Sequence, residues 1–436
     1  MSASGESALG VRETSAPPVR IVHLGLGAFH RSHQAWYTAR ASDAEQWGIA
    51  AYSGRSVALA EALNAQGGRY TLVVRSADAD RSEVIGSIAR AHGGSELTRF
   101  VADVAAPTTS ILSLTITEAA YSPRETDADV PLLRTLADGA DPSTLQPSTA
   151  LGRVVLALDA RRRSGSGPLA LVSCDNLPDN GGMLRAAVRS LAGGVPGLTD
   201  WVERSVSFVS SSVDRITPRL SSDETAELAV RYSDRAPVVT EPFSDWVIEG
   251  DFPAGRPRWE TAGARFTDDL EPWEARKLWL LNGAHTLLAS LGRLRGHSTV
   301  SESIADAECL RAVEAYWEEA CGHLPATLEL REYRAALLDR FRNPRIRHLL
   351  EQIALDSDTK VRVRIVPVAE RERRAARPGS ACAQVIAAWM AAEHQSLDRE
   401  SVAGTIAGIS SVLGGDDVFV DAVIDALVPF ESLTLR

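Results

Sequence analysis

The stretch IVHLGLGAFHRSHQ at residues 21–34 decides the fold of this chain. Its first four residues predict a buried strand, and the glycines that follow predict a tight turn into a helix. In a dinucleotide-binding turn, one glycine makes the turn and the next lets a pyrophosphate approach the backbone at the helix N-terminus. Gly25 and Gly27 occupy these positions, whereas His30 stands where a third glycine is usual. Packing alone can also require two glycines, but we favour a dinucleotide site made of Gly25, Leu26, Gly27, Ala28, Phe29 and His30.

The end of the second predicted strand, WGIAAYSG at residues 47–54, bears on which dinucleotide binds. An NAD site usually carries Asp or Glu there to hold the ribose 2′-hydroxyl. This chain has Gly54, Arg55 and Ser56 instead, and Arg55 could receive the 2′-phosphate of NADP. An arginine on a solvated helix start is the alternative interpretation, so these residues leave the choice between NAD and NADP open.

Strand and helix patterns alternate through the first two thirds of the chain. Nearly continuous apolar strands, typical of strands buried on both faces, recur at residues 69–76, 111–121, 169–176 and 205–215. Their alternation with helical segments predicts βαβ units and a parallel sheet, and later patterns are mostly helical. We therefore predict an α/β fold in three parts: a disordered arm at 1–18, a Rossmann-type doubly wound sheet domain that binds NAD(P) at 19–266, and a mostly α-helical C-terminal domain with substrate-binding and catalytic residues at 267–436.

Composition narrows the classes of function. The 436 residues carry a net charge of −11 without a dense basic run, which argues against nucleic acid or an anionic membrane as partner. No apolar run approaches the roughly 20 residues of a membrane span, and residues 1–18 lack the apolar core of a signal peptide. The four cysteines are too dispersed for a disulfide scaffold or a cysteine zinc site. We expect a soluble, cytoplasmic protein.

The helical pattern at residues 272–291 holds the strongest candidates for catalysis. At 100° per residue, Lys277 falls within an apolar stripe, with His285 about 80° and Asn282 about 140° away. A lysine in such a stripe either loses hydration, which lowers the pKa of its amine, or extends its ammonium to solvent. Asn and His side chains can orient a hydroxyl or carbonyl oxygen. Each residue alone could be structural, but the three together on one helix favour catalysis.

These motifs together resemble the mannitol dehydrogenase family, the long-chain polyol-specific dehydrogenases and reductases. The most distinctive stretches are GLGAFHRSHQ (25–34), TEPFSDWVIEGDFP (240–253) and KLWLLNGAHTLLA (277–289). Similar to others of the family are SCDNLPDNG (173–181), VDRITP (213–218) and RFRNPRIRHLLEQIALDSDTK (340–360). The match runs in consistent order from about residue 20 to the C-terminus.

The resemblance implies an NAD-dependent, metal-independent oxidoreductase, with NADP possible, that interconverts a secondary alcohol of an acyclic polyol or polyol derivative with the ketose. The mannitol/fructose type, including mannitol 1-phosphate/fructose 6-phosphate, is the first expectation, and reduction of fructuronate to mannonate is the alternative. By the same resemblance, Lys277 is the general base in oxidation and the general acid in reduction, and Asn282 and His285 bind the reacting oxygen. Around the substrate it places Asn176, Val213, Asp214 and Lys360.

Several departures from the family pattern bear on substrate and cofactor. TEAAY at 117–121 lacks the lysine of the family's TEKGY, and DSDTK at 356–360 lacks the glycine of DGSxK. Gly54 and Ser56 stand opposite the cofactor-selecting acids of NAD-dependent members. His30 and His33 invite a metal interpretation, but with no carboxylate nearby we predict no metal site.

One basic set remains outside this scheme: Arg345, Arg347, Arg362 and Arg364. It could bind a phosphate or carboxylate of the substrate, although such sets are more often solvated faces with ion pairs. A non-catalytic dinucleotide sensor would not need the Lys277 helix, and a Rossmann-type methyltransferase would leave that helix unexplained. The sequence does not predict an oligomeric state.

Overall fold

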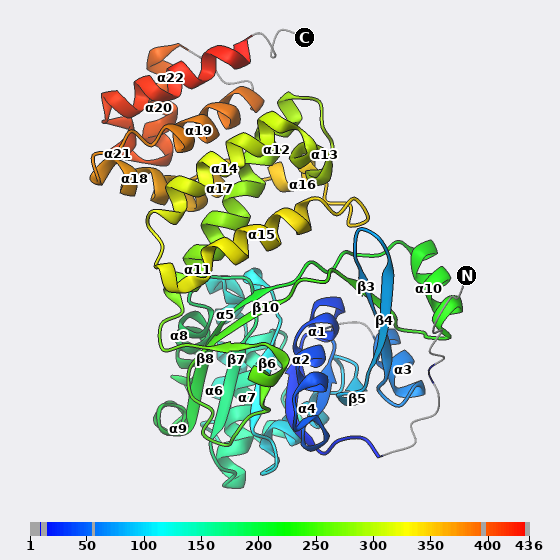
Figure 1. Ribbon diagram of the computed structural model, residues 1–436. Helices are drawn as coiled ribbons and strands as arrows, with labels where there is room; N and C mark the ends of the chain where they lie inside the picture. The colour runs from blue at the N-terminus through cyan, green and yellow to red at the C-terminus, as the bar shows by residue number, and fades with distance from the viewer. Residues whose placement is uncertain (1–8, 10–14, 55–56, 394–397, 432–436) are drawn as a thin grey trace. The chain divides into compact units, whose positions relative to one another are not determined.

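The computed structural model (Figure 1) describes residue 9 and residues 15–54, 57–393 and 398–431. The chain divides into two compact units, Met1–Glu271 and Pro272–Arg436, hereafter unit 1 and unit 2. Arg55, Ser56 and most of the predicted arm at 1–18 lie outside the described residues. Within the described residues, no helix has the length and apolar character that crossing a membrane requires.

Unit 1 is built on an eight-stranded sheet of order β11-β10-β8-β7-β6-β1-β2-β5. The strands are β1 (Val19–Leu24), β2 (Gly48–Tyr52), β5 (Ile88–His92), β6 (Ile111–Leu114), β7 (Leu169–Ser173), β8 (Val206–Asp214), β10 (Asp245–Glu249) and β11 (Arg265–Phe266). From β5 to β8 all neighbours are parallel, and β10 joins β8 antiparallel. The six parallel strands follow the Rossmann order 3-2-1-4-5-6, so the predicted doubly wound sheet is confirmed.

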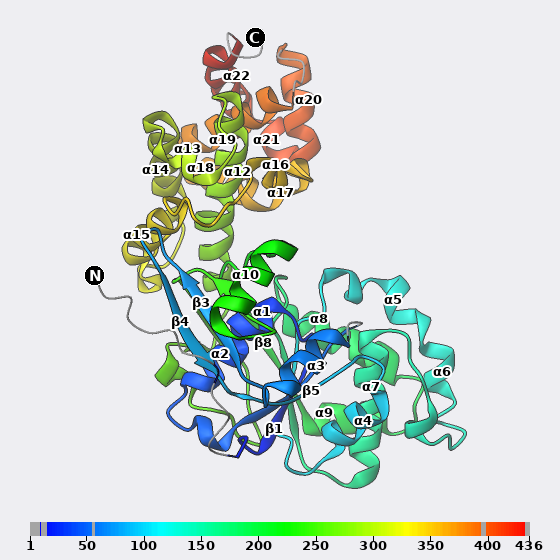
Figure 2. The same ribbon diagram turned by 90° about the vertical axis from the view of Figure 1, so that its right-hand side faces the viewer.

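Helices cover both faces of this sheet, which is why its strands read as continuous apolar runs. Along β1, Val22 and Leu24 pack into a core shared with α4 and α7, whereas Ile21 packs into a second core shared with α2 and α3. Figure 2 shows α2, α4 and α7 around this sheet. The helices of unit 1 are α1 (Ala28–Ser32), α2 (Gln34–Arg40), α3 (Ala58–Ala65), α4 (Leu97–Ala105), α5 (Pro123–Ala128), α6 (Val130–Arg134), α7 (Ala150–Ser164), α8 (Asn180–Ala192), α9 (Leu198–Ser205) and α10 (Ser222–Tyr232).

The strand predicted at residues 69–76 forms, but outside the main sheet. It is β3 (Tyr70–Arg75), the middle strand of a small sheet of order β4-β3-β9, with β4 (Asp80–Ile85) antiparallel and β9 (Val238–Thr240) parallel to it. The hairpin partner β4 has the polar sequence DRSEVI and only one buried residue, so it leaves no apolar signal in the sequence. The hairpin is therefore an insertion between the second and third strands of the Rossmann order.

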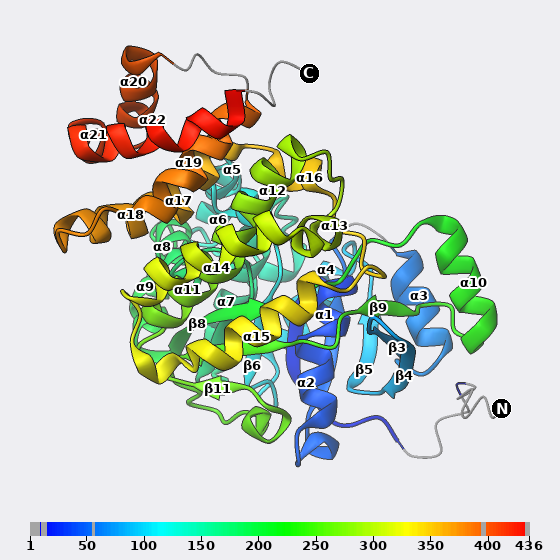
Figure 3. The same cartoon turned by 45° about the horizontal axis from the view of Figure 1, so that its top comes forward.

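Unit 2 consists of helices, as predicted for the C-terminal part. They are α11 (Glu271–Arg276), which begins at the last residue of unit 1, η5 (Lys277–Gly283), α12 (Ala284–Leu294), α13 (Val300–Ala305), α14 (Ala307–Cys321), η6 (Ala326–Leu328), α15 (Leu330–Phe341), α16 (Leu350–Ala354), α17 (Ser357–Arg364), α18 (Val366–Arg374), α19 (Ser380–Ala392), α20 (Arg399–Ile409), α21 (Ser411–Gly414) and α22 (Asp417–Glu431). Helix α12 is buried from Ala284 to Gly292 and packs against α14, α16 and α19 (Figure 3). A helix that is buried on all sides forms the core of such a bundle.

Candidate functional site

The glycine-rich turn lies at the carboxyl end of β1, where the strand order reverses between β1 and β6. Gly25 has φ +122°, and a side chain there would collide with the backbone oxygen of Thr115 after β6, so only glycine fits. A Cβ on Gly27, by contrast, would meet nothing closer than the Gly25 carbonyl oxygen at 3.6 Å, and no side chain caps α1. This open space beside a helix start at the switch point fits the pyrophosphate of a dinucleotide.

The other predicted turn residues differ in what they can offer a ligand. The His30 ring is 1 % exposed and stacks on the His23 ring with 3.4 Å between centroids. Burial holds the pKa of His30 well below its usual value, against the smaller opposing effect of the Gln34 side chain. The buried His30 ring therefore packs against the interior of unit 1, and only the backbone of His30 is available to a cofactor. Leu26 is buried, and Ala28 and Phe29 are half-buried.

Asp175, two residues after the end of β7, fixes the neighbouring strand ends and was missed by the sequence analysis. Its Oδ1 accepts the N–H groups of Ile116 and Thr117 at 2.7 and 2.9 Å, and its Oδ2 accepts Tyr121 Oη at 2.8 Å. These bonds hold Thr117 at φ +75°, a rare conformation for a β-branched residue. The exposed Asn176 follows and is thereby positioned at the carboxyl edge. The sequence signal that could have revealed Asp175 is an acidic residue two positions after a buried strand.

Val213 and Asp214 end β8 at the same edge. Both are buried, and in the antiparallel pair they lie opposite Trp246 and Asp245 of β10. Because β7 and β8 are parallel neighbours, their carboxyl ends lie together. The structure thus brings Asn176, Val213 and Asp214 to the edge that holds the glycine-rich turn.

Lys277, Asn282 and His285 follow one another along one helical run of unit 2, but the uniform α-helix predicted at 272–291 is wrong. Residues Lys277–Gly283 form a π-helix between α11 and α12. Its i→i+5 hydrogen bonds widen each turn by close to one residue, so the predicted angles of about 80° and 140° do not hold. One widened turn and one ordinary turn together span about eight residues. Ideal π and α geometry therefore puts Lys277 and His285, eight positions apart, on one face, and Asn282 is the residue five positions after the lysine.

Contacts from α14 explain the π geometry. Trp317 Nε1 donates a 2.8 Å hydrogen bond to the carbonyl oxygen of Leu280 within the π segment. A side chain on Gly283 would collide with the phenol of Tyr316. Two contacts thus fit the π segment to α14: the hydrogen bond from Trp317 and the close approach of the Gly283 backbone to Tyr316. Neither contact can be recognised from the sequence of the segment itself.

The three candidate residues differ in burial. Lys277 and Asn282 are half-buried, so the lysine is less enclosed than a position inside an apolar stripe implies. His285 is 7 % exposed, and its Nε2 has no hydrogen-bond partner among the described residues. An unpartnered buried nitrogen carries a desolvation cost, which a bound ligand can remove.

The surroundings of His285 keep it neutral. Its ring contacts those of Phe341 at 5.0 Å and His348 at 4.8 Å. Burial is the main cause that holds the pKa of His285 well below 6.5, and His348, Arg340 and Arg364 add to it electrostatically. At neutral pH the ring is therefore an uncharged hydrogen-bonding group in a locally positive environment.

Lys360, predicted to bind substrate, is engaged with backbone at the end of α16. Its Nζ donates to the carbonyl oxygen of Ile353 at 3.0 Å and to that of Leu355. Burial and then the nearby Arg364 lower the pKa of its amine. The structure places Lys360 on α17, one turn before Arg364.

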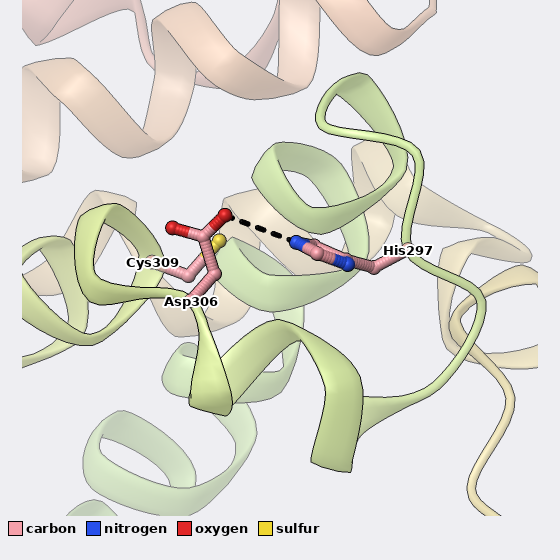
Figure 4. Close-up of side chains that lie close together, drawn as sticks. All are labelled: His297, Asp306 and Cys309. Carbon is pink, nitrogen blue, oxygen red and sulfur yellow. Dashed lines mark hydrogen bonds and ion pairs between the residues drawn. The ribbon is translucent and has the colours of Figure 1, made fainter.

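A possible metal centre in unit 2 is better explained as a helix cap. Ligand atoms of His297, Asp306 and Cys309 lie within 4.8 Å of one another, and His297 Nε2 is 3.1 Å from Asp306 Oδ2 (Figure 4). Arg295 Nε donates to the same oxygen at 2.8 Å, and Oδ1 accepts the N–H of Glu308 at the start of α14. Burial raises the pKa of the Cys309 thiol to about 12. A cation would have to displace Arg295, so the absence of a metal site stays our prediction.

Comparisons with known proteins bear on both units. The family models described as mannitol dehydrogenase Rossmann domain and mannitol dehydrogenase C-terminal domain match residues 19–261 and 269–405. The chain is 35% identical over 360 residues to D-mannonate oxidoreductase of Escherichia coli (strain K12), covering 80% of this chain and 74% of that protein. It is 38% identical over 374 residues to D-arabinitol 4-dehydrogenase of Ralstonia nicotianae (strain ATCC BAA-1114 / GMI1000), covering 82% and 80%. The structure of Pseudomonas fluorescens mannitol 2-dehydrogenase in ternary complex with NAD and D-mannitol matches with a TM-score of 0.76 and 29% identity, over 97% of this chain and 94% of that one.

Proposed function

The chain belongs to the mannitol dehydrogenase family, and from this membership we propose that it is an NAD-dependent oxidoreductase that interconverts a secondary alcohol of an acyclic polyol, or of a polyol derivative, with the corresponding ketose. One observation supports the proposal most: Lys277, Asn282 and His285 follow one another on one helical run of unit 2, and the buried Nε2 of His285 has no hydrogen-bond partner among the described residues. Oxidation of an alcohol needs one group to take the hydroxyl proton and others to hold the oxygen, and this run supplies both.

The cofactor site in this proposal is the turn from Gly25 to His30. Its support is the open space at Gly27 and the uncapped start of α1, which suit a pyrophosphate. Bound NAD supplies the hydride acceptor in oxidation, and NADH the donor in reduction. The NAD complex of the Pseudomonas fluorescens relative favours NAD, and Arg55 keeps NADP among the cofactors to test.

Lys277 is the proton-transfer group of the proposed mechanism. In oxidation its neutral amine takes the hydroxyl proton of the substrate, and in reduction the ammonium returns a proton to the carbonyl oxygen. Lys277 is half-buried rather than buried, which is compatible with exchange of this proton with water between turnovers.

Asn282 and His285 hold the reacting oxygen. As the hydroxyl loses its proton, negative charge develops on the oxygen, and donors already in place stabilise that charge. Burial keeps His285 neutral, so its role is to donate a hydrogen bond rather than to act as a second acid. We further assign substrate contacts to Asn176, Val213, Asp214 and Lys360, following the family resemblance.

Reduction of ketoses by the purified full chain tests the proposal. NADH and NADPH oxidation is followed by absorbance with fructose, fructose 6-phosphate and fructuronate, and then with further pentuloses and uronates. We expect turnover with at least one ketose, and a loss of about 10²–10⁴-fold in Lys277→Ala with NADH binding unchanged by fluorescence titration. Lys277→Arg is the matched control, since it keeps the charge but cannot release the proton, and should be equally inactive. Full activity of Lys277→Ala, or NADH binding without turnover of any ketose, would overturn the proposal; the second result would indicate a sensor.

A further inference from the structure

The four arginines of the basic set have different surroundings in the structure. Arg345, Arg347 and Arg362 are exposed, whereas Arg364 is half-buried at the end of α17. Arg364 Nη1 donates to the carbonyl oxygen of Asn282 at 3.3 Å and to Thr286 Oγ1 at 3.2 Å. It therefore contacts the backbone of Asn282 directly, and it is close enough to His285 to lower the pKa of that ring electrostatically.

The rest of the Arg364 guanidinium has no partner in the described part of the chain. Its Nε is buried without a hydrogen bond, none of the described residues bonds its Nη2, and no carboxylate among them pairs with it. Nε and Nη2 form one edge of the guanidinium plane, the edge that accepts the two oxygens of a carboxylate side by side. Burial lowers the pKa of Arg364 to about 10, and a partly desolvated cation without an anion is unfavourable unless a ligand supplies one.

Three side chains around His285 are positively charged or can become so. Arg340, Arg364 and His348 all act on His285, and each of them is cationic or becomes cationic on protonation. A site of this kind is unexpected in a chain with a net charge of −11, whose average field repels anions. Local cations are what an anionic substrate needs in order to bind such a protein.

We propose that the Nε–Nη2 edge of Arg364 binds a carboxylate of the substrate, so that the pair interconverted is an aldonate and its ketouronate rather than a neutral polyol and ketose. The inference rests on the proposed function, since it names the substrate class for the same site. A phosphate presents the same anionic oxygens, and the experiment separates the two.

The test compares substrates that differ in charge, on the full chain with NADH. Initial rates are measured with fructuronate, fructose 6-phosphate and fructose for the wild type, Arg364→Gln and Arg364→Lys, with Arg362→Gln as the control for loss of one positive charge on the same helix. We expect the wild type to prefer fructuronate over fructose by about 100-fold in kcat/KM. Arg364→Gln should remove most of that preference through KM, Arg364→Lys should keep part of it, and Arg362→Gln should keep all of it.

The ratio between substrates separates binding of the carboxylate from support of the helix. If Arg364 only holds the Asn282 carbonyl, Arg364→Gln lowers kcat/KM for fructuronate and fructose by the same factor, and the inference is overturned. A wild-type preference for fructose, or an Arg364-dependent preference for fructose 6-phosphate, also overturns it while leaving the proposed function intact.

Equilibrium binding distinguishes failure of the inference from failure of the proposed function. Mannonate and mannitol are titrated calorimetrically into the NADH-loaded wild type and into NADH-loaded Arg364→Gln. Mannonate binding that is lost in the variant supports the inference even if no ketose is turned over, in which case only the proposed function fails. Equal binding of mannonate and mannitol overturns the inference whatever the activity.

Discussion

The glycine-rich turn of unit 1 and the π-helical segment of unit 2 both depend on a glycine, but for different reasons. Gly25 adopts φ +122°, which other residues rarely do, so the backbone conformation itself requires glycine. Gly283 has an ordinary helical φ of −63°, and only the close approach of Tyr316 excludes a side chain. The first requirement can be read from the residue type within a local pattern. The second belongs to a contact with a helix that follows more than twenty residues later.

The largest expected effect is that of Gly25→Ala. The alanine would have to keep a positive φ and also collide with the backbone oxygen of Thr115. We expect the free energy of unfolding of unit 1 to fall by about 4 kcal/mol or more, and NADH binding to be lost. Urea unfolding and fluorescence titration measure the two effects.

Gly27→Ala separates folding from binding at the same turn. A Cβ at Gly27 has free space around it, so the variant should unfold at nearly the same urea concentration as the wild type. The methyl group would occupy the space proposed for the pyrophosphate, and we expect NADH affinity to fall by at least about 10-fold. Unchanged affinity would show that the dinucleotide does not approach this backbone.

Gly283→Ala is the matching change in unit 2. Its methyl group would overlap the phenol of Tyr316, and relief requires movement of α14 or of the π segment. We expect a loss of about 2–3 kcal/mol in the stability of unit 2 and a drop in kcat, with NADH binding by unit 1 preserved. In the background Tyr316→Ala the added methyl group should cost much less. A cost independent of residue 316 would refute the packing explanation of the glycine.

Acid should destabilise both units through histidines that burial keeps neutral. Burial lowers the pKa of His23 in unit 1 to about 3, and it holds that of His285 in unit 2 well below 6.5. Below pH 6.5 the unfolded chain therefore binds protons that the folded chain does not, so the free energy of unfolding decreases as the pH falls. Each such histidine contributes a slope of about 1.4 kcal/mol per pH unit between its folded pKa and 6.5. Urea unfolding at pH 7.5, 6.5 and 5.5 should show this decrease in the free energy of unfolding. In His285→Asn, the dependence of the stability of unit 2 on pH should be smaller by the contribution of one histidine. An unchanged slope would mean that folding does not lower the pKa of His285.

The same contrast explains which features the sequence could predict. The Rossmann order follows from buried apolar strands and the Gly25–Gly27 turn, because these depend on local pattern and residue type. The hairpin strand β4 was missed because its stability comes from pairing with β3 rather than from its own polar residues. Lys277 and His285 were recognised as candidates, yet the uniform α-helix predicted around them was wrong because a 100° wheel cannot anticipate a π turn. Their roles in substrate chemistry stay predictions until the variants are measured.

The smallest expected effect tests whether tertiary contacts hold the π turn. Trp317→Phe keeps most of the packing but removes the donor to the Leu280 carbonyl oxygen. An unsatisfied buried acceptor should cost about 1–2 kcal/mol in the stability of unit 2. If the π geometry depends on this donor, the segment relaxes toward an α-helix, His285 rotates away from Lys277, and kcat falls further than the stability loss alone implies. If kcat is unchanged while stability falls, the widened turn is set by the close packing of Gly283 against Tyr316. Trp317 would then satisfy the carbonyl group without determining the helix geometry.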